Sequence, residues 1–191
     1  MITAVILAGG KSSRMGRDKL LMMLRGETLL DAAVRRFSEV FDRVFVSVSD
    51  PEKYSEVKAE KIVDIYKNCG PMGGLHAALT HTKAGGIFLV AADLPFSGPE
   101  AAKKIVELCG ENDAALMRDH QGRYEPLFAY YKPTLLPVVE KMLAIGSHKM
   151  SVLLESARIK AITKADLGPL WKDNMLANIN RIEDYESLLT P

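Results

Sequence analysis

Glycines and basic side chains follow the first apolar run of the chain, a combination suited to binding phosphate groups. The run ends at Leu7 and Ala8, the paired glycines Gly9 and Gly10 come next, and basic residues follow before the next apolar segment. Glycine permits backbone conformations and close approaches that a Cβ would obstruct. Successive N–H groups in such a loop form an anion-binding nest, to which Arg14 and Lys19 can add fixed charge. The segment therefore predicts a phosphate-binding loop.

Two common phosphate-binding loops do not fit this segment. A Walker loop has four residues between its glycines, followed by Lys and then Ser or Thr. Here five residues separate Gly10 from Gly16, and Arg17 follows. The dinucleotide fingerprint G-x-G-x-x-G fails because Gly9 and Gly10 are adjacent. P-loop enzymes and dehydrogenases are thereby excluded, whereas an ordinary strand-to-helix turn with solvated charges stays open from these residues alone.

A carboxylate follows a second buried run further along the chain. Asp93 comes directly after the apolar residues 86–92, and Pro95 restricts the turn that follows. Such a carboxylate suits Mg²⁺, a hard cation that takes oxygen ligands and substrate phosphates. The residues by themselves also allow Asp93 to cap the next segment. Asp93 is therefore a candidate magnesium ligand.

Apolar runs alternate with amphipathic stretches, as in β-α-β units around a mainly parallel sheet. We expect strands at 5–7, 43–48, 61–64, 86–92, 114–117, 126–131 and 159–162, and helices at 29–41, 75–82, 99–109, 135–145, 151–155 and 183–189. The strands at 114–117 and 126–131 predict a hairpin or antiparallel excursion. Ser49-Asp50-Pro51 predicts the start of a helix, and 166–173 predicts a loop. The fold class is a Rossmann-like three-layer α/β/α sandwich, formed by one domain over 1–191.

Four segments of chemical interest follow expected strand ends. They are the first glycine loop, Asp64, the glycine-rich residues 70–74 and Asp93. In an open parallel sheet, ligands bind outside the carboxyl ends of the strands, where the strand order reverses. We therefore expect these segments to converge at one edge of the sheet and to form a single site.

Composition limits the partners of this chain. Of its 191 residues, 48% are hydrophobic and 26% are charged, which is ordinary for a soluble globular protein. A net charge of +1 gives no broad electrostatic case for binding nucleic acid or membranes. Cys69 and Cys109 lie far apart and form no C-x-x-C motif, which argues against a disulfide framework or a zinc site. The sequence shows neither a secretory signal nor a membrane-spanning stretch, so we expect a cytoplasmic protein.

The run from Leu7 to Lys19 matches the L-A-G-G-x-x-x-R-M-G-x-D-K signature of nucleotidyltransferases. From Ala4 to Tyr185 the chain resembles the molybdenum cofactor guanylyltransferases, a family within the glycosyltransferase-A-like nucleotidyltransferases. Further matches are Asp93-Leu94-Pro95, Gly70-Pro71-Met72-Gly73-Gly74, Glu125-Pro126-Leu127, Asn178-Ile179-Asn180 and Glu183-Asp184-Tyr185. Four positions depart from the family pattern: Met72 replaces Leu, Arg181 and Ile182 replace Thr-Pro, and Ser47 stands where some members carry a nucleotide-contacting Asn.

This resemblance implies transfer of GMP from GTP to molybdenum-molybdopterin, with Mg²⁺ as cofactor and pyrophosphate as leaving group. It implies that Arg14 and Lys19 contact the triphosphate and that Asp93 binds the metal. The other nucleotide- or pterin-contacting residues that it implies are Leu7, Ala8, Gly9, Gly10, Asp64, Gly70, Pro71, Gly73, Asn178 and Asn180. Candidate protein partners are a molybdenum-insertion enzyme and apo-molybdoenzymes or their chaperones.

Three alternatives remain open at this point. Within the same class, the chain could transfer CMP to molybdopterin or act on a sugar phosphate. Glu125-Pro126-Leu127 and Asn178-Ile179-Asn180 favour the guanylyl enzyme, because cytidylyl relatives differ there. From another class, it could be a non-catalytic module that binds nucleotide and hands the cofactor to an apo-enzyme. The presence of Arg14, Lys19 and Asp93 speaks against such a degenerate site.

Overall fold

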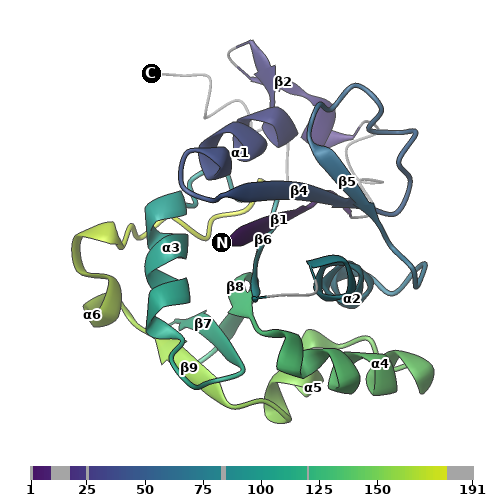
Figure 1. The fold of residues 1–191 in the computed structure, drawn as a ribbon. Helices are drawn as coiled ribbons and strands as arrows, with labels where there is room; N and C mark the ends of the chain where they lie inside the picture. Colours follow the sequence, from purple (N-terminus) through teal and green to yellow (C-terminus); the bar gives the residue numbers. More distant parts are fainter. Residues whose placement is uncertain (1, 10–17, 25, 83–84, 120, 180–191) are drawn as a thin grey trace.

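A computed structural model describes residues 2–9, 18–24, 26–82, 85–119 and 121–179 (Figure 1). Its strands are β1 (Thr3–Leu7), β2 (Met23–Leu24), β3 (Glu27–Thr28), β4 (Arg43–Val48), β5 (Glu60–Val63), β6 (Ile87–Ala91), β7 (Ala114–Arg118), β8 (Tyr124–Tyr131) and β9 (Ile159–Ile162). In this part of the chain, seven strands form one sheet in the order β5-β4-β1-β6-β8-β7-β9, and β2 pairs with β3 in a separate ribbon. The β2–β3 ribbon was not predicted.

All pairings in the main sheet are parallel except the two made by β8. The predicted antiparallel excursion is therefore confirmed, and it is part of the main sheet: β8 lies between β6 and β7. Strands β1 and β6 are buried along their whole length, as continuous apolar runs in a parallel sheet should be.

Helices cover both faces of the sheet. They are α1 (Leu29–Ser38), α2 (Pro71–Thr82), α3 (Pro99–Leu108), α4 (Leu136–Ala144), α5 (Met150–Glu155) and α6 (Lys164–Leu167), with short 3-10 turns at Lys19–Leu21, Pro133–Leu135 and Gly168–Leu170. Helices α1, α3 and α6 share one core with the sheet, and α2, α4 and α5 share the other (Figure 1). The predicted three-layer sandwich is confirmed.

Helix α1 shows how the local sequence produces this packing. The Thr28 hydroxyl accepts a hydrogen bond from the Asp31 amide at 3.0 Å, which caps the first turn. Apolar side chains then recur at helical spacing and face the sheet, where the Phe37 ring stacks on Phe88 of β6 at a centroid distance of 6.3 Å. Burying a side chain of this size contributes about 1.5–3 kcal/mol. The packing fixes α1 against β6.

The strand order reverses next to β1. From β1 the chain continues to β4 and β5 on one side, and then returns to β6 on the other side of β1. The ends of these strands are in register: the Ala8 amide donates to Ser47 O at 2.9 Å, and the Ala92 amide donates to Leu7 O at 3.2 Å. The crevice between β1 and β6 is thus a switch point, where sheets of this kind bind ligands.

Two predictions for local structure were wrong because they missed short helical segments. The helix predicted at 75–82 starts earlier, because α2 begins at Pro71, a residue whose fixed φ suits the first helical position. The predicted loop at 166–173 contains the end of α6 and a 3-10 turn, because Thr163 and Asp166 form a capping box.

A third prediction was wrong because it placed the start of a helix where the chain forms turns. Ser49-Asp50-Pro51 starts no helix but leads into turns over residues 51–56. Asp50 does accept a bond from the Glu52 amide at 3.1 Å. Only Tyr54 is buried within that stretch, so no apolar stripe holds a helix against the core. The helix expected at 183–189 lies outside the described residues.

Candidate functional site at the carboxyl edge of the sheet

The first group at this edge is an ion pair at the switch point. Lys19 Nζ lies 2.7 Å from Asp93 Oδ2, and the two side chains are 17% and 24% exposed. Lys19 also donates to Ile179 O at 2.6 Å, and the Ile179 amide donates to Asp93 O at 3.1 Å. Three segments far apart in the sequence therefore meet at one point. Partial burial reduces screening by water, so this pair interacts more strongly than an exposed one.

Asp18 anchors the backbone next to Lys19. Its Oδ1 accepts from the Leu20 amide at 3.0 Å, and its Oδ2 accepts from the Tyr54 hydroxyl at 2.7 Å and pairs with Lys53. Burial raises the pKa of Asp18, but these three hydrogen bonds outweigh that effect and hold the pKa below its usual range. Asp18 thus stays ionised at neutral pH and keeps Lys19 in place.

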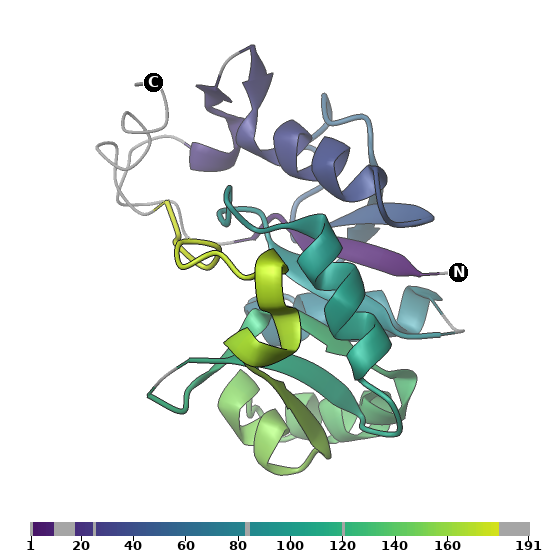
Figure 2. The ribbon, with the colours of Figure 1, turned by 90° about the vertical axis from the view of Figure 1, so that its left-hand side faces the viewer.

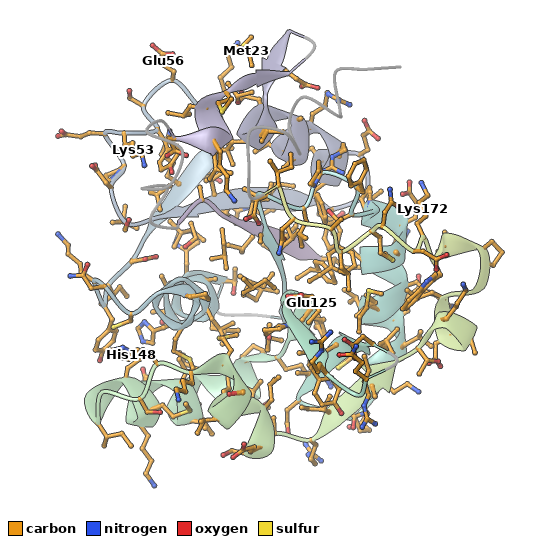
Figure 3. All side chains as sticks on the ribbon, turned by 180° about the vertical axis from the view of Figure 1, so that it is seen from behind. Met23, Lys53, Glu56, Glu125, His148 and Lys172 are labelled. Carbon is orange, nitrogen blue, oxygen red and sulfur yellow. The ribbon has the colours of Figure 1, made fainter. Side chains whose placement is uncertain are left out.

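A second carboxylate, Glu125, lies near Asp93. Glu125 is at the start of β8, and because β8 runs antiparallel to β6, its start lies at the same edge as the end of β6. Burial raises the pKa of Glu125, a bond from the Leu127 amide at 2.9 Å offsets part of the rise, and the negative charge of Asp93 adds to it. Figure 3 shows Glu125 in the middle of the view, away from the peripheral Met23 and His148. The sequence assigned Glu125 no role, because no local pattern places the start of β8 beside Asp93.

The second group at this edge is centred on Asp64, directly after β5. Its amide donates to Val48 O at 3.0 Å, which ties it to the end of β4. The Ser47 hydroxyl donates to Asp64 Oδ1 at 3.1 Å. Burial raises the pKa of Asp64, and the bond from Ser47 lowers it in part. Ser47, considered in the sequence as a nucleotide contact, is 2% exposed and holds Asp64.

The first turn of α2 packs directly against this group. A Cβ on Gly74 would lie 2.5 Å from Leu7 Cδ2 and 2.9 Å from Ser47 Oγ, and a Cβ on Gly73 would lie 2.7 Å from Tyr66 O. Only glycine allows this approach. The positive end of the α2 dipole is thereby placed at the same edge as Asp64, where it favours negative charge.

The predicted site residues divide into three sets. The structure gathers Leu7, Ala8, Lys19, Asp64, Gly73 and Asp93 at one edge, through the contacts given above. Gly70 and Pro71 precede Gly73 at the start of α2, Asn178 precedes Ile179, and Gly9 is exposed with no described atom within 4 Å of a Cβ placed there. Gly10, Arg14 and Asn180 lie outside the described residues, as do Gly16 and Glu183-Asp184-Tyr185. The ligands of all these residues stay predictions.

The model of the MobA-like NTP transferase domain matches residues 4–161. The chain belongs to this family. A probable molybdenum cofactor guanylyltransferase of Clostridium perfringens is 30% identical over 98% of this chain and 96% of its own length. One from Methanosarcina mazei is 28% identical over 98% of this chain and 89% of its own length.

A solved structure resembles the whole fold. The molybdopterin-guanine dinucleotide biosynthesis protein A of Archaeoglobus fulgidus superposes with a TM-score of 0.85 at 27% identity, covering 98% of this chain and 96% of that one. Lys19, Asp64 and Asp93 fall inside the MobA-like match, whereas Ile179 lies beyond its end. The described residues contain no helix long and apolar enough to cross a membrane.

Proposed function

We propose that this protein transfers GMP from GTP to molybdenum-molybdopterin, giving the guanine dinucleotide form of the cofactor and pyrophosphate. The observation that carries the proposal is the meeting of Lys19 and Asp93 at the switch point of a MobA-like sheet. The names of the similar proteins, probable molybdenum cofactor guanylyltransferase, support the choice of both substrates. We assign the activity to the cytoplasm.

Asp93 fits the Mg²⁺ that the proposal requires. Its carboxylate is partly exposed, and its negative charge lies close enough to Glu125 to raise the pKa of that residue. No group of three or more metal-ligating side chains occurs among the described residues. Mg²⁺ binds through one or two carboxylates, waters and substrate phosphates. When bound, it offsets negative charge on the phosphate oxygens and on the leaving pyrophosphate.

Lys19 supplies a fixed positive charge for the triphosphate. In the structure this charge is balanced by Asp93 Oδ2 and by a backbone carbonyl. An incoming triphosphate offers Lys19 a second anion, so the ammonium can turn toward it and leave Asp93 free for metal. Arg14, outside the described residues, is assigned to the same phosphates.

Asp64 is assigned to the nucleoside. It lies at the end of β5, with its Oδ1 held by Ser47, and it can accept hydrogen bonds from guanine or ribose. The reaction then needs little covalent help from the protein. A terminal phosphate oxygen of molybdopterin forms a bond to the α-phosphorus of GTP, and the bond from that phosphorus to pyrophosphate breaks. The protein accelerates the reaction by positioning the reactants and by stabilising the charge on the phosphate oxygens.

The deciding experiment compares GTP with CTP. The protein is incubated with molybdenum-molybdopterin and each nucleotide, with magnesium or with EDTA, while pyrophosphate and the dinucleotide product are measured. We expect product with GTP and magnesium only. Preference for CTP would contradict the guanylyl assignment, and nucleotide binding without pyrophosphate release would support the non-catalytic module.

A further inference from the structure

Arg36 is a half-buried cation outside the site described above. Its guanidinium donates to three carbonyls of one turn: Nη1 to Pro95 O and to Ser97 O at 2.8 Å, and Nη2 to Leu94 O at 3.3 Å. Its Nε donates to Ala32 O at 3.4 Å. Within the described part of the chain it donates to no carboxylate.

The turn that Arg36 holds begins directly after Asp93. It joins β6 to α3, and the Ser97 hydroxyl closes it by donating to Leu94 O at 2.7 Å. Three carbonyl dipoles thus point their negative ends at one place. Without a cation there the three carbonyls would repel one another, Pro95 O and Ser97 O would lose the donor that Arg36 supplies, and the turn would rearrange.

The fold delivers Arg36 to this turn from α1. Phe37, the next residue, is fully buried against β6, so the position of α1 is fixed. The bond to Ala32 O, one helical turn earlier, shows that the side chain runs back toward the start of α1. That direction brings the guanidinium to the edge where β6 ends, and Figure 2 shows the β6–α3 turn beside α1.

We propose that Arg36 is a positioning residue for Asp93. By holding the turn 94–97 it sets the direction of the Asp93 carboxylate toward metal and Lys19, although it touches neither substrate nor metal. This inference rests on the proposed role of Asp93 in GMP transfer.

Arg35 provides a matched control. It is the neighbouring residue of the same type on the same helix, but it is exposed and pairs with Glu27 at 2.7 Å and Glu39 at 3.4 Å. A hollow of about 380 Å³ adjoins Arg36 and the turn. Water could enter it and replace a truncated side chain. Methionine, which keeps the aliphatic stem, is therefore a better substitution than alanine.

The experiment compares Arg36→Met, Arg36→Lys and Arg35→Met in the full chain. We measure kcat, KM for GTP, the magnesium concentration for half-maximal activity, and amide hydrogen exchange in the turn. Misplacing a catalytic group by about 1 Å can cost ~10²-fold, so we expect kcat of Arg36→Met to fall by about tenfold to a hundredfold. Its magnesium requirement should rise, its KM for GTP should change little, and the Ser97 amide should exchange faster.

Arg36→Lys tests whether the turn needs the guanidinium hydrogen bonds or only a large, positively charged side chain. The kcat and magnesium requirement of Arg36→Lys should lie between those of the wild type and Arg36→Met, because one ammonium cannot reproduce the planar fork of guanidinium donors. Arg35→Met should match the wild type in every measurement. Folding is checked by thermal unfolding of each variant.

Wild-type kcat and magnesium dependence in folded Arg36→Met would overturn this inference alone, provided that Asp93→Asn is inactive. A loss of activity explained entirely by the unfolded fraction would overturn it as well. Full activity of Asp93→Asn would overturn both this inference and the proposed function.

Discussion

The two groups at the carboxyl edge are held together by different forces. At β1 and β6, Lys19 and Asp93 form a partly buried ion pair joined by the distant Ile179. At β4 and β5, Asp64 accepts from the neutral Ser47 hydroxyl, and α2 packs against them through glycine. In the first group, each charge of the ion pair can instead interact with a bound ligand. The second group offers a closely packed surface and one carboxylate, Asp64, that is partly removed from water. Chemistry is therefore expected at the first and recognition of the nucleoside at the second.

The largest effect should come from Asp93→Asn. The substitution keeps the shape but removes the charge that pairs with Lys19 and is assigned to metal. Losing a preorganised electrostatic group costs about 10²–10³-fold in rate, and we expect the upper end for kcat. Asp173→Asn, at an exposed carboxylate, is the control. Turnover of Asp93→Asn within about twofold of the wild type would remove Asp93 from the chemistry.

Lys19→Ala should come next. It removes the ammonium that lies between Asp93 and the expected triphosphate, and kcat should fall about 10²-fold while the fold persists. Lys19→Arg keeps the charge and should recover part of the loss. Lys104→Ala, on the surface of α3, controls for loss of a lysine. Steady-state kinetics with GTP and magnesium test this, and an unchanged kcat in Lys19→Ala would show that the ion pair is only structural.

Gly74→Ala tests the second group. The added Cβ would lie 2.5 Å from Leu7 Cδ2 and 2.9 Å from Ser47 Oγ, so these side chains or α2 must shift. We expect a loss of about 1–3 kcal/mol in the free energy of unfolding, as for other overpacked sites. KM for GTP should rise more than kcat falls. Gly98→Ala is the control, since its nearest atom would be 3.9 Å away and its φ is −94°. Equal stability of the two variants in urea would refute the close approach.

The smallest effect concerns Asp64 and pH. Because burial raises the folded-state pKa of Asp64 above 3.8, the folded state binds more protons than the unfolded state just above that pH. The contribution of Asp64 to the free energy of unfolding therefore falls as pH rises through this window. Asp64→Asn should remove that decline, and Ser47→Ala should steepen it, because the hydroxyl that lowers the pKa is lost.

Urea unfolding of these variants between pH 3.5 and 7 measures the effect. Asp173→Asn is again the control, and its effect on the free energy of unfolding should depend on pH in the opposite direction. Hydrogen bonds from Lys164 and Trp171 lower the pKa of Asp173. Its contribution is present at neutral pH and is lost as pH falls. A difference between the wild type and Asp64→Asn that is independent of pH would contradict the raised pKa.

Much of the scaffold could be predicted from the sequence, because buried parallel strands are continuous apolar runs. The residues 43–48 and 159–162 form the expected strands without change, and Asp64 and Asp93 were placed at strand ends. The start of α2 was missed because Gly70-Pro71 and two further glycines are typical of a turn. Here they serve packing: Gly73 and Gly74 lie against Tyr66 O and Leu7.

Long-range partners could not be predicted. Nothing near Lys19 specifies Ile179 as the acceptor of its second hydrogen bond, and nothing near Arg36 specifies the turn after Asp93. Such contacts follow from how the layers pack, not from local periodicity. The start of β8 illustrates the same limit, since Glu125 lies close enough to Asp93 for its pKa to be raised only because β8 is inserted between β6 and β7.

The hydrogen bond from Lys19 to Ile179 O can form only late in translation. Its two residues are separated by 160 positions, so a ribosome makes Lys19 and Asp93 long before the segment that joins them. A nascent chain that has already formed β1 and β6 still lacks this closing contact. The hydrogen bond from Lys19 to Ile179 O can therefore form only after every strand of the sheet, the last of which ends at Ile162, has been translated.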